Sequence, residues 1–177
     1  MRRSTNSTCS SSLTQRSRVY RAIGWAGLLA GSLDITAALV ESVLEGKSPI
    51  YLLQAIAGGL LGMSSFRGGL ATAALGVFFH FLIATTASAV FYLASCKLKF
   101  LVKHAISSGL LYGVVVYIFM YYIVLPISAY HTQIALPPMA KLIRDAAVHM
   151  FMVGLPISLV IPKYSLTSCL RADSAFS

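Results

Sequence analysis

The sequence predicts an all-α protein: a polytopic transmembrane helix bundle with four spans plus one short re-entrant or interfacial helix. The first observation is composition. Of the 177 residues, 57% are hydrophobic and 11% are charged, whereas a soluble domain carries about 25% charged residues. The second is the run from Leu70 to Ser95, which has no formal charge and can cross a hydrocarbon core of about 30 Å. The third is that basic residues gather at the ends of apolar runs, as they do beside spanning helices.

The domain organisation that follows is one bundle over residues 21–163 between two tails. Residues 1–20 are polar, rich in Ser and Thr, and basic without an acid, so we expect a disordered cytoplasmic tail. Residues 164–177 are expected to form a short C-terminal tail. The three cysteines have an odd count and no close spacing, which predicts free thiols rather than a disulfide framework or a zinc site.

The formal net charge of +9 raises the question of nucleic acid as a partner. No basic groove or stacking motif accompanies this charge, and the basic residues flank apolar runs instead. The expected partner is therefore the lipid bilayer, whose cytoplasmic surface is anionic, and no nucleic acid is expected.

The first spanning helix is expected over residues 22–44. Gly27 and Gly31 form a GxxxG pair, which allows a neighbouring helix to approach closely. Helical spacing continues this stripe of small residues through Asp34 and Glu41. The shared face should point into the bundle, because a carboxylate that faces lipid is costly.

The second apolar segment, residues 50–66, is short and interrupted. Ser48 suits an N-cap and Pro49 a first helical position. Several glycines and Gln54 then interrupt the apolar run, which ends at Arg67. Such a segment suits either a thin crossing or a re-entrant helix.

The longest apolar run, residues 70–95, carries His80 near its middle. Small residues at helical spacing lie on the same stripe as His80, so this histidine should face the bundle rather than lipid. The span over residues 105–130 has a second GxxxG pair, Gly109 and Gly113.

The last span is expected over residues 139–161, after the Pro137-Pro138 pair. Proline inside a helix removes a hydrogen bond and clashes with the preceding turn. Pro126 in the preceding span and Pro156 in the last span are therefore expected to kink their helices.

The distribution of the 14 Lys and Arg residues distinguishes four spans from five. If residues 50–66 do not cross, about 10 basic residues lie on one side and about 4 on the other, a strong positive-inside bias. If they do cross, the split is about 8 to 6. We therefore expect four spans with both termini in the cytoplasm, and five spans remain the alternative.

Ionisable side chains fall at similar depth on three helices. At about 1.5 Å per residue, Asp34, His80 and His149 all lie near the membrane midplane, and Glu41 lies two turns further out. Intramembrane carboxylates and imidazoles commonly belong to proton or ion pathways, and histidine titrates near physiological pH. These four residues are the candidates for a proton or ion relay. The alternative is that Asp34 pairs with a histidine or a backbone donor and fixes the helix register.

A second polar group is expected where the last helix enters the membrane from outside. Arg144 can pair with Glu41 or Glu45 across this outer mouth, and Arg67 can serve the same acids. Asp145 lies beside them. The alternative is a solvated helix start, with the aspartate near the positive end of the helix dipole.

Metal and haem chemistry have weaker sequence support. No HExxH motif or other tight spacing of ligands is present. Haem held by His80 and His149 would require two histidines that differ in depth by about 6 Å at the rise of a helix. We therefore predict no metal and no cofactor, and do not expect an enzyme.

The run HFLIATTASAVFYLAS around His80 and the run HMFMVGLPI around His149 resemble bacterial inner-membrane proteins of the YagU type. Those proteins are small and polytopic, and one is associated with acid resistance. The resemblance implies a multi-pass protein of the bacterial inner membrane with a link to acid stress.

The function that these observations predict is a proton-coupled transporter or channel-like component, either alone or as a homo-oligomer. Two alternatives stay open. One is a structural membrane subunit whose polar groups only lock helix packing. The other is an intramembrane protein that uses a metal or haem.

Overall fold

The computed structural model describes residues 5–129 and 138–162, and every element in these ranges is helical. The all-α prediction is confirmed. The elements are α1 (Thr5–Leu44), α2 (Pro49–Leu61), the 3-10 helix η1 (Gly62–Arg67), α3 (Gly69–Lys97), α4 (Lys99–Lys103), α5 (Ala105–Phe119), the π-helix η2 (Met120–Val124), α6 (Leu125–Ile127), α7 (Met139–Val148), the π-helix η3 (His149–Gly154) and α8 (Leu155–Val160). The predicted C-terminal tail, residues 164–177, lies outside the described residues.

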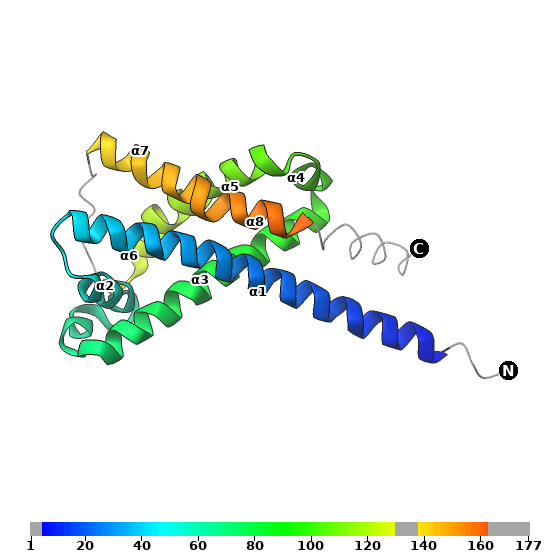
Figure 1. The fold of residues 1–177 in the computed structure, drawn as a ribbon, viewed down its shortest axis with the longest axis horizontal. Helices are drawn as coiled ribbons and strands as arrows, with labels where there is room; N and C mark the ends of the chain where they lie inside the picture. The colour runs from blue at the N-terminus through cyan, green and yellow to red at the C-terminus, as the bar shows by residue number, and fades with distance from the viewer. Residues whose placement is uncertain (1–4, 130–137, 163–177) are drawn as a thin grey trace.

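Four long helical rods alternate in direction. Gly27 and Gly31 of α1 lie against Thr85 and Phe81 of α3 respectively, so residue numbers rise along α1 as they fall along α3. Gly109 and Gly113 of α5 lie against Ser158 and His149 respectively, so α5 likewise runs antiparallel to the rod of α7, η3 and α8, which also packs against α1. Figure 1 shows these rods crossing the molecule, with α1 at the front.

The two predicted GxxxG pairs lie where helices come closest. A Cβ at Gly31 would lie 2.9 Å from the Phe81 ring. A Cβ at Gly113 would lie 2.5 Å from the carbonyl oxygen of His149 in η3. Only a residue without a side chain permits this approach, so each pair fixes one antiparallel contact of the bundle.

The segment α2–η1 begins and ends at the same end of the bundle. This follows from the antiparallel contact of α1 and α3, since α2 connects the end of α1 to the start of α3 (Figure 1). Five helical stretches, including 49–67, are long and apolar enough to cross a membrane. A membrane crossed by both α1 and α3 is nevertheless not crossed by α2. The arrangement therefore fits four spans plus a re-entrant or interfacial helix.

The capping that starts α2 follows the sequence prediction. The Ser48 hydroxyl accepts a hydrogen bond from the backbone N–H of Ile50, and Pro49 occupies the first turn. Within the helix, Gln54 donates to the Gly69 carbonyl at 3.0 Å. The one long polar side chain of the segment thereby holds α2 against α3 instead of facing lipid.

The side chains of the bundle are arranged for an apolar medium. Its core is small and is built from Ala26, Ala30, Phe91, Val153, Ile157 and Ile161. Large apolar side chains face outward on every rod, such as Leu93 at 63% exposed and Leu111 at 64%. In water this surface would be a large exposed apolar patch, whereas in a bilayer it is the face that contacts lipid. The molecule is therefore a multi-pass membrane protein.

A π-helical turn directly precedes each of the two short helices that contain the prolines predicted to kink their spans. The π-helix η2 directly precedes α6, which contains Pro126, and η3 directly precedes α8, which contains Pro156. A proline ring clashes with the carbonyl four residues earlier. The wider π turn moves that carbonyl away, and such turns occur often at functional sites.

Two sequence predictions differ from the structure. The segment predicted as a disordered tail (residues 1–20) is helical from Thr5. It forms the first part of α1, which extends beyond the other helices of the bundle (Figure 1). Adding residues to a helix that already exists avoids the free-energy cost of nucleating a new one. The polar residues before the span can therefore continue α1. In addition, Cys96 is disulfide-bonded, so the prediction of free thiols is wrong for this residue.

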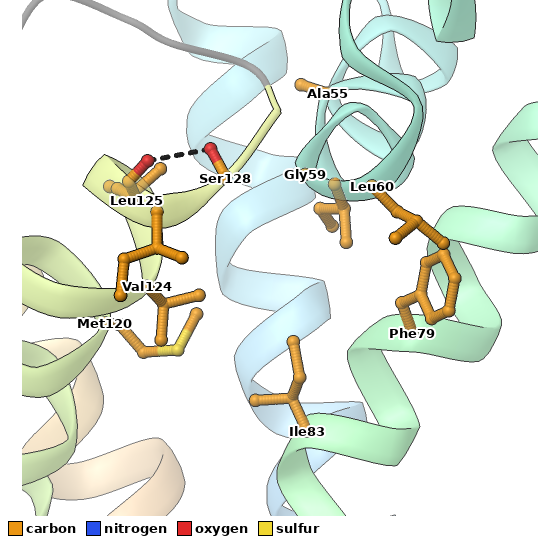
Figure 2. Close-up of a pocket in the computed structure, with 11 residues that line it drawn as sticks. Ala55, Gly59, Leu60, Phe79, Ile83, Met120, Val124, Leu125 and Ser128 are labelled. Atoms are coloured by element: carbon orange, nitrogen blue, oxygen red, sulfur yellow. Dashed lines mark hydrogen bonds between the residues drawn. The ribbon is translucent and has the colours of Figure 1, made fainter.

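An apolar cleft opens between α3 and the η2–α6 segment. The rod that η2 and α6 continue, α5, touches α3 nearer the other end of the bundle, where the Tyr112 hydroxyl donates to the Ala87 carbonyl at 2.7 Å. Beyond that contact the cleft has a volume of about 540 Å³, with α2 closing one end and α1 behind it (Figure 2). Ile83 and Phe79 lie on one wall, and Met120 and Val124 on the other (Figure 2).

Candidate functional site

The structure brings Asp34, in the last third of α1, together with His80, near the middle of α3. The Nε2 atom of His80 lies 4.0 Å from the Oδ2 atom of Asp34. The side chains are 14% and 18% exposed respectively. Close packing at Gly31 sets this register, because it places the turn of α1 that carries Asp34 opposite the turn of α3 that carries His80.

The hydrogen bond of His80 goes to the backbone rather than to the carboxylate. Its Nε2 lies 2.8 Å from the Gly31 carbonyl oxygen. A carbonyl can only accept, so Nε2 carries the proton and donates. The neutral ring therefore has its proton on Nε2 and an acceptor at Nδ1. A second proton at Nδ1 would create an imidazolium beside the Asp34 carboxylate, within ion-pair distance.

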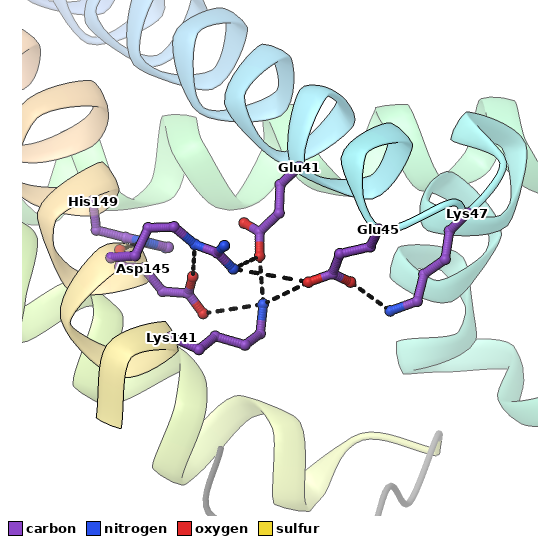
Figure 3. A network of polar contacts seen from close by, with 7 residues as sticks. Glu41, Glu45, Lys47, Lys141, Asp145 and His149 are labelled. Atoms are coloured by element: carbon purple, nitrogen blue, oxygen red, sulfur yellow. Dashed lines mark hydrogen bonds and ion pairs between the residues drawn. The ribbon is translucent and has the colours of Figure 1, made fainter. Parts of the chain in front are cut away.

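A cluster of charged side chains joins α1 to α7 at the end of the bundle where α2 lies (Figure 3). We call it the outer cluster, and it consists of Glu41, Glu45, Lys47, Lys141, Arg144 and Asp145. The carboxylate of Glu41 accepts hydrogen bonds from Lys141 and Arg144. Asp145 lies 3.6 Å from each of the same two cations. Three acids and three bases balance one another, which limits the cost of placing charge beside lipid.

Glu45 lies at the outer edge of this cluster, in the turn after α1. It accepts a hydrogen bond from the Lys47 Nζ at 2.7 Å, and the Lys141 Nζ lies 3.4 Å away. The bond from Lys47 and the positive charge of Lys141 lower the pKa of Glu45 to about 2. Glu45 therefore stays ionised well below neutral pH.

A polar chamber of about 330 Å³ lies between the end of α1, the start of α2 and Lys141. Its wall includes Glu41, Glu45 and Lys47 from the outer cluster, and Tyr51 from α2. Ala38, one turn beyond Asp34 on α1, also lines it. The chamber therefore reaches to within about one helical turn of the Asp34 level.

His149 takes its hydrogen bond and its ring contact from residues other than Asp34 and His80. Its Nδ1 is 2.9 Å from the Asp145 carbonyl oxygen on its own helix, and its ring centroid is 5.3 Å from that of Tyr117. Among the described residues, no hydrogen bond or ion pair joins His149 to Asp34 or His80. Of the three residues predicted at the midplane, the described structure brings Asp34 and His80 within ion-pair distance, while His149 lies beside the outer cluster (Figure 3).

The residues predicted for the outer mouth have different positions. The structure places Arg144 against Glu41, which is the pairing proposed from the sequence. Asp145 joins the same cluster. Arg67 ends η1 and forms no ion pair with a described residue.

Sequence reasoning missed the central place of Lys141. This lysine reaches Glu41, Glu45 and Asp145. The signal was present in the four-residue spacing of Lys141 and Asp145, which places both on one helix face. Two buried oxygens nearby, the Tyr117 hydroxyl and Asp145 Oδ1, have no hydrogen-bond partner among the described residues.

Metal ligands do not gather in the part of the chain that the structure describes. No group of three His, Cys, Asp or Glu side chains there could hold a metal ion.

Four antiparallel rods with outward-facing apolar side chains, half-buried ionisable groups and a further helix that begins and ends at one end of the bundle define a multi-pass helical membrane protein. Beyond this class, the chain matches no protein-family model, no curated protein and no solved structure.

Proposed function

We propose that this protein is a proton-coupled transporter or channel-like component in which Asp34 and His80 form the proton-binding site. One observation carries the proposal: the Nε2 of His80 and the Oδ2 of Asp34 lie 4.0 Å apart, on two helices that cross the membrane. A carboxylate and an imidazole inside a membrane are costly and are typical of proton and ion pathways.

The pair suits reversible proton binding. The neutral ring of His80 keeps Nδ1 as an acceptor, since Nε2 donates to Gly31. A proton bound there gives the ring a positive charge on a histidine whose Nε2 lies 4.0 Å from the Asp34 carboxylate.

The outer half of a pathway is proposed to run from this pair to the polar chamber. Ala38 is the residue of α1 that follows Asp34 by one turn and lines the chamber. Glu41 is the next acid along that face, and it is held by Lys141 and Arg144. Breaking these ion pairs would expose Glu41 to a proton arriving from outside.

The test is proton flux into proteoliposomes driven by a pH gradient. Asp34→Asn and His80→Gln keep the side-chain volumes and remove the titrating groups. Each should reduce the flux at least tenfold. The matched control is His104→Gln, because His104 is exposed and its ring contacts only Phe100 among the described aromatic rings. Absence of flux in wild-type protein, or full flux in both site variants, would reject the proposal.

A second candidate function is a structural membrane subunit. The hydrogen bond from His80 to the Gly31 carbonyl favours it, since this bond ties α3 to α1 without any titration. Under this alternative His80→Gln lowers thermal stability, while Asp34→Asn changes neither stability nor any flux.

We further propose that the protein resides in the bacterial inner membrane with both termini in the cytoplasm, alone or as a homo-oligomer. The charge bias between the two ends of the bundle supports this orientation. The location and a role in acid stress rest on the resemblance to YagU-type proteins. Growth of a deletion strain at low pH, with and without the plasmid-borne wild-type chain, tests the role in acid stress.

A further inference from the structure

The apolar cleft and the polar chamber adjoin each other on α2. We propose that together they bind one membrane phospholipid, with an acyl chain in the cleft and the headgroup in the chamber. This inference rests on the shapes and linings of the two cavities. It does not depend on proton transfer by Asp34 and His80.

The lining of the cleft selects a hydrocarbon occupant. Its walls are apolar apart from Ser128, whose hydroxyl donates to the Leu125 carbonyl at 2.7 Å (Figure 2). A cavity with so few polar groups gives water no partners and does not hold it stably. Its volume of about 540 Å³ lies in the range of roughly 300–1,000 Å³ that ligand sites occupy.

The cleft also opens where hydrocarbon is the surrounding medium. Phe79 and Ile83 belong to the spanning part of α3, and Met120 and Val124 to the facing rod. The α3 and α5 rods touch at Tyr112 and Ala87 but separate beyond that point. A lipid chain can therefore enter from the side without leaving its own phase.

The chamber provides charges for a headgroup. Lys47 and Lys141 can donate to a phosphate, and Glu41 and Glu45 can accept from an amine. All four side chains line the chamber, and their formal charges sum to zero. A headgroup that carries both a phosphate and an amine fits this lining better than one that carries a phosphate alone.

The two cavities adjoin at α2 in the order that a lipid requires. Ala55 of α2 lines both. The cleft extends from Ala55 towards the midplane, and the chamber extends from it towards the end of α1, at headgroup depth. Tyr51 in the chamber wall is a residue type that favours this interface.

The first experiment uses native mass spectrometry of protein purified in mild detergent from mixed vesicles. Gly59→Leu should fill the cleft, because Gly59 lines it and a Cβ there would meet only the Ser128 Cβ, at 3.9 Å. The control is Gly24→Leu, since Gly24 has no neighbour within 4 Å of an added Cβ. The fraction of protein that retains one phospholipid should fall at least fivefold in Gly59→Leu and stay unchanged in Gly24→Leu.

A second variant distinguishes loss of lipid binding from loss of folding. Ile83→Trp fills the same cleft from the α3 wall, and gel filtration with circular dichroism shows whether each variant is folded. Equal lipid retention by wild type and by folded Gly59→Leu and Ile83→Trp would overturn the proposal.

The second experiment locates the chain and the headgroup. A phosphatidylethanolamine with a diazirine near the end of one chain should label Met120 and Ile83 more than the lipid-facing Leu93 and Leu111. Retention should favour phosphatidylethanolamine over phosphatidylglycerol several-fold, and Lys47→Gln together with Glu45→Gln should remove that preference. Even labelling of all four positions, or cross-links between two copies through Met120, would overturn the site. Equal retention of both lipids by wild type would overturn the headgroup assignment.

Discussion

His80 donates its Nε2 hydrogen bond to the carbonyl oxygen of Gly31, at 2.8 Å, although the carboxylate of Asp34 lies only 4.0 Å away. The backbone bond fixes which ring nitrogen carries the proton. It leaves Asp34 as a nearby charge rather than a direct partner. The ring can therefore gain a proton at Nδ1 without losing its anchor on α1.

The contact beneath this pair predicts a stability effect. Gly31→Leu places a side chain where the Phe81 ring lies 2.9 Å and the Ala84 Cβ 3.2 Å from an added Cβ. Overpacking of this kind costs about 1–3 kcal/mol, and it separates His80 from the Gly31 carbonyl. Thermal unfolding in detergent should show a lower Tm for Gly31→Leu. Gly24→Leu serves as the control, and an equal Tm for both variants would contradict the close contact.

The outer cluster predicts an energetic coupling between α1 and α7. Glu41→Gln and Arg144→Gln, alone and combined, form a double-mutant cycle for their ion pair. Both side chains are partly exposed, so we expect a coupling of about 0.5–1 kcal/mol rather than the larger value of a buried pair. Arg67→Gln with Arg144→Gln is the control cycle and should be additive. A coupling near zero for the first pair would show that the ion pair does not stabilise the bundle.

The Glu45–Lys47 contact predicts a pH effect. The pKa of Glu45 is about 2 in the folded chain against an ordinary value of 4.5. A lowered folded-state pKa adds stability above pH 4.5, and this contribution is lost as the pH falls towards 2. Melting curves over this window should show a smaller loss of Tm for Glu45→Gln than for wild type. Parallel pH profiles of the two proteins would disagree with the lowered pKa.

The position of α2 predicts that both of its flanks lie on the same side of the membrane, which reporter fusions can measure. Fusions in the turn before α2 and directly after Arg67 should report the same side of the membrane, since α2 begins and ends at one end of the bundle. A fusion in the connection around Leu98 should report the opposite side. Signals from opposite sides for the two fusions that flank α2 would establish five crossings instead.

The fold class could be predicted because the length of each apolar run and the spacing of its small residues can be read from a single stretch of sequence. Gly27, Gly31, Gly109 and Gly113 identified two helix contacts, and the α1 contact set the register that joins Asp34 to His80. The direction of His149 could not be predicted in this way. Its ring bonds to the Asp145 carbonyl of its own helix, and the choice of rotamer depends on packing against Tyr117, a residue distant in sequence.

The cleft, and the place of Lys141 at the centre of the outer cluster, also could not be predicted from the sequence. The cleft exists because α3 and the η2–α6 segment diverge after the Tyr112–Ala87 contact, and divergence of two rods leaves no local pattern. Lys141 bonds to Glu41, which is 100 positions earlier in the chain. Helix periodicity gives the face of each residue but not the distance between faces of different helices.

The return of α2 and η1 to the end of the bundle at which α1 ends has a consequence for how such a chain can change during evolution. Because α2 returns to the side from which it starts, gaining or losing it leaves the sidedness of every later helix intact. Loss of any one of the four rods would invert all that follows. Among the apolar segments of the described chain, the α2–η1 segment is thus the one whose change or loss does not reverse the sidedness of the later helices.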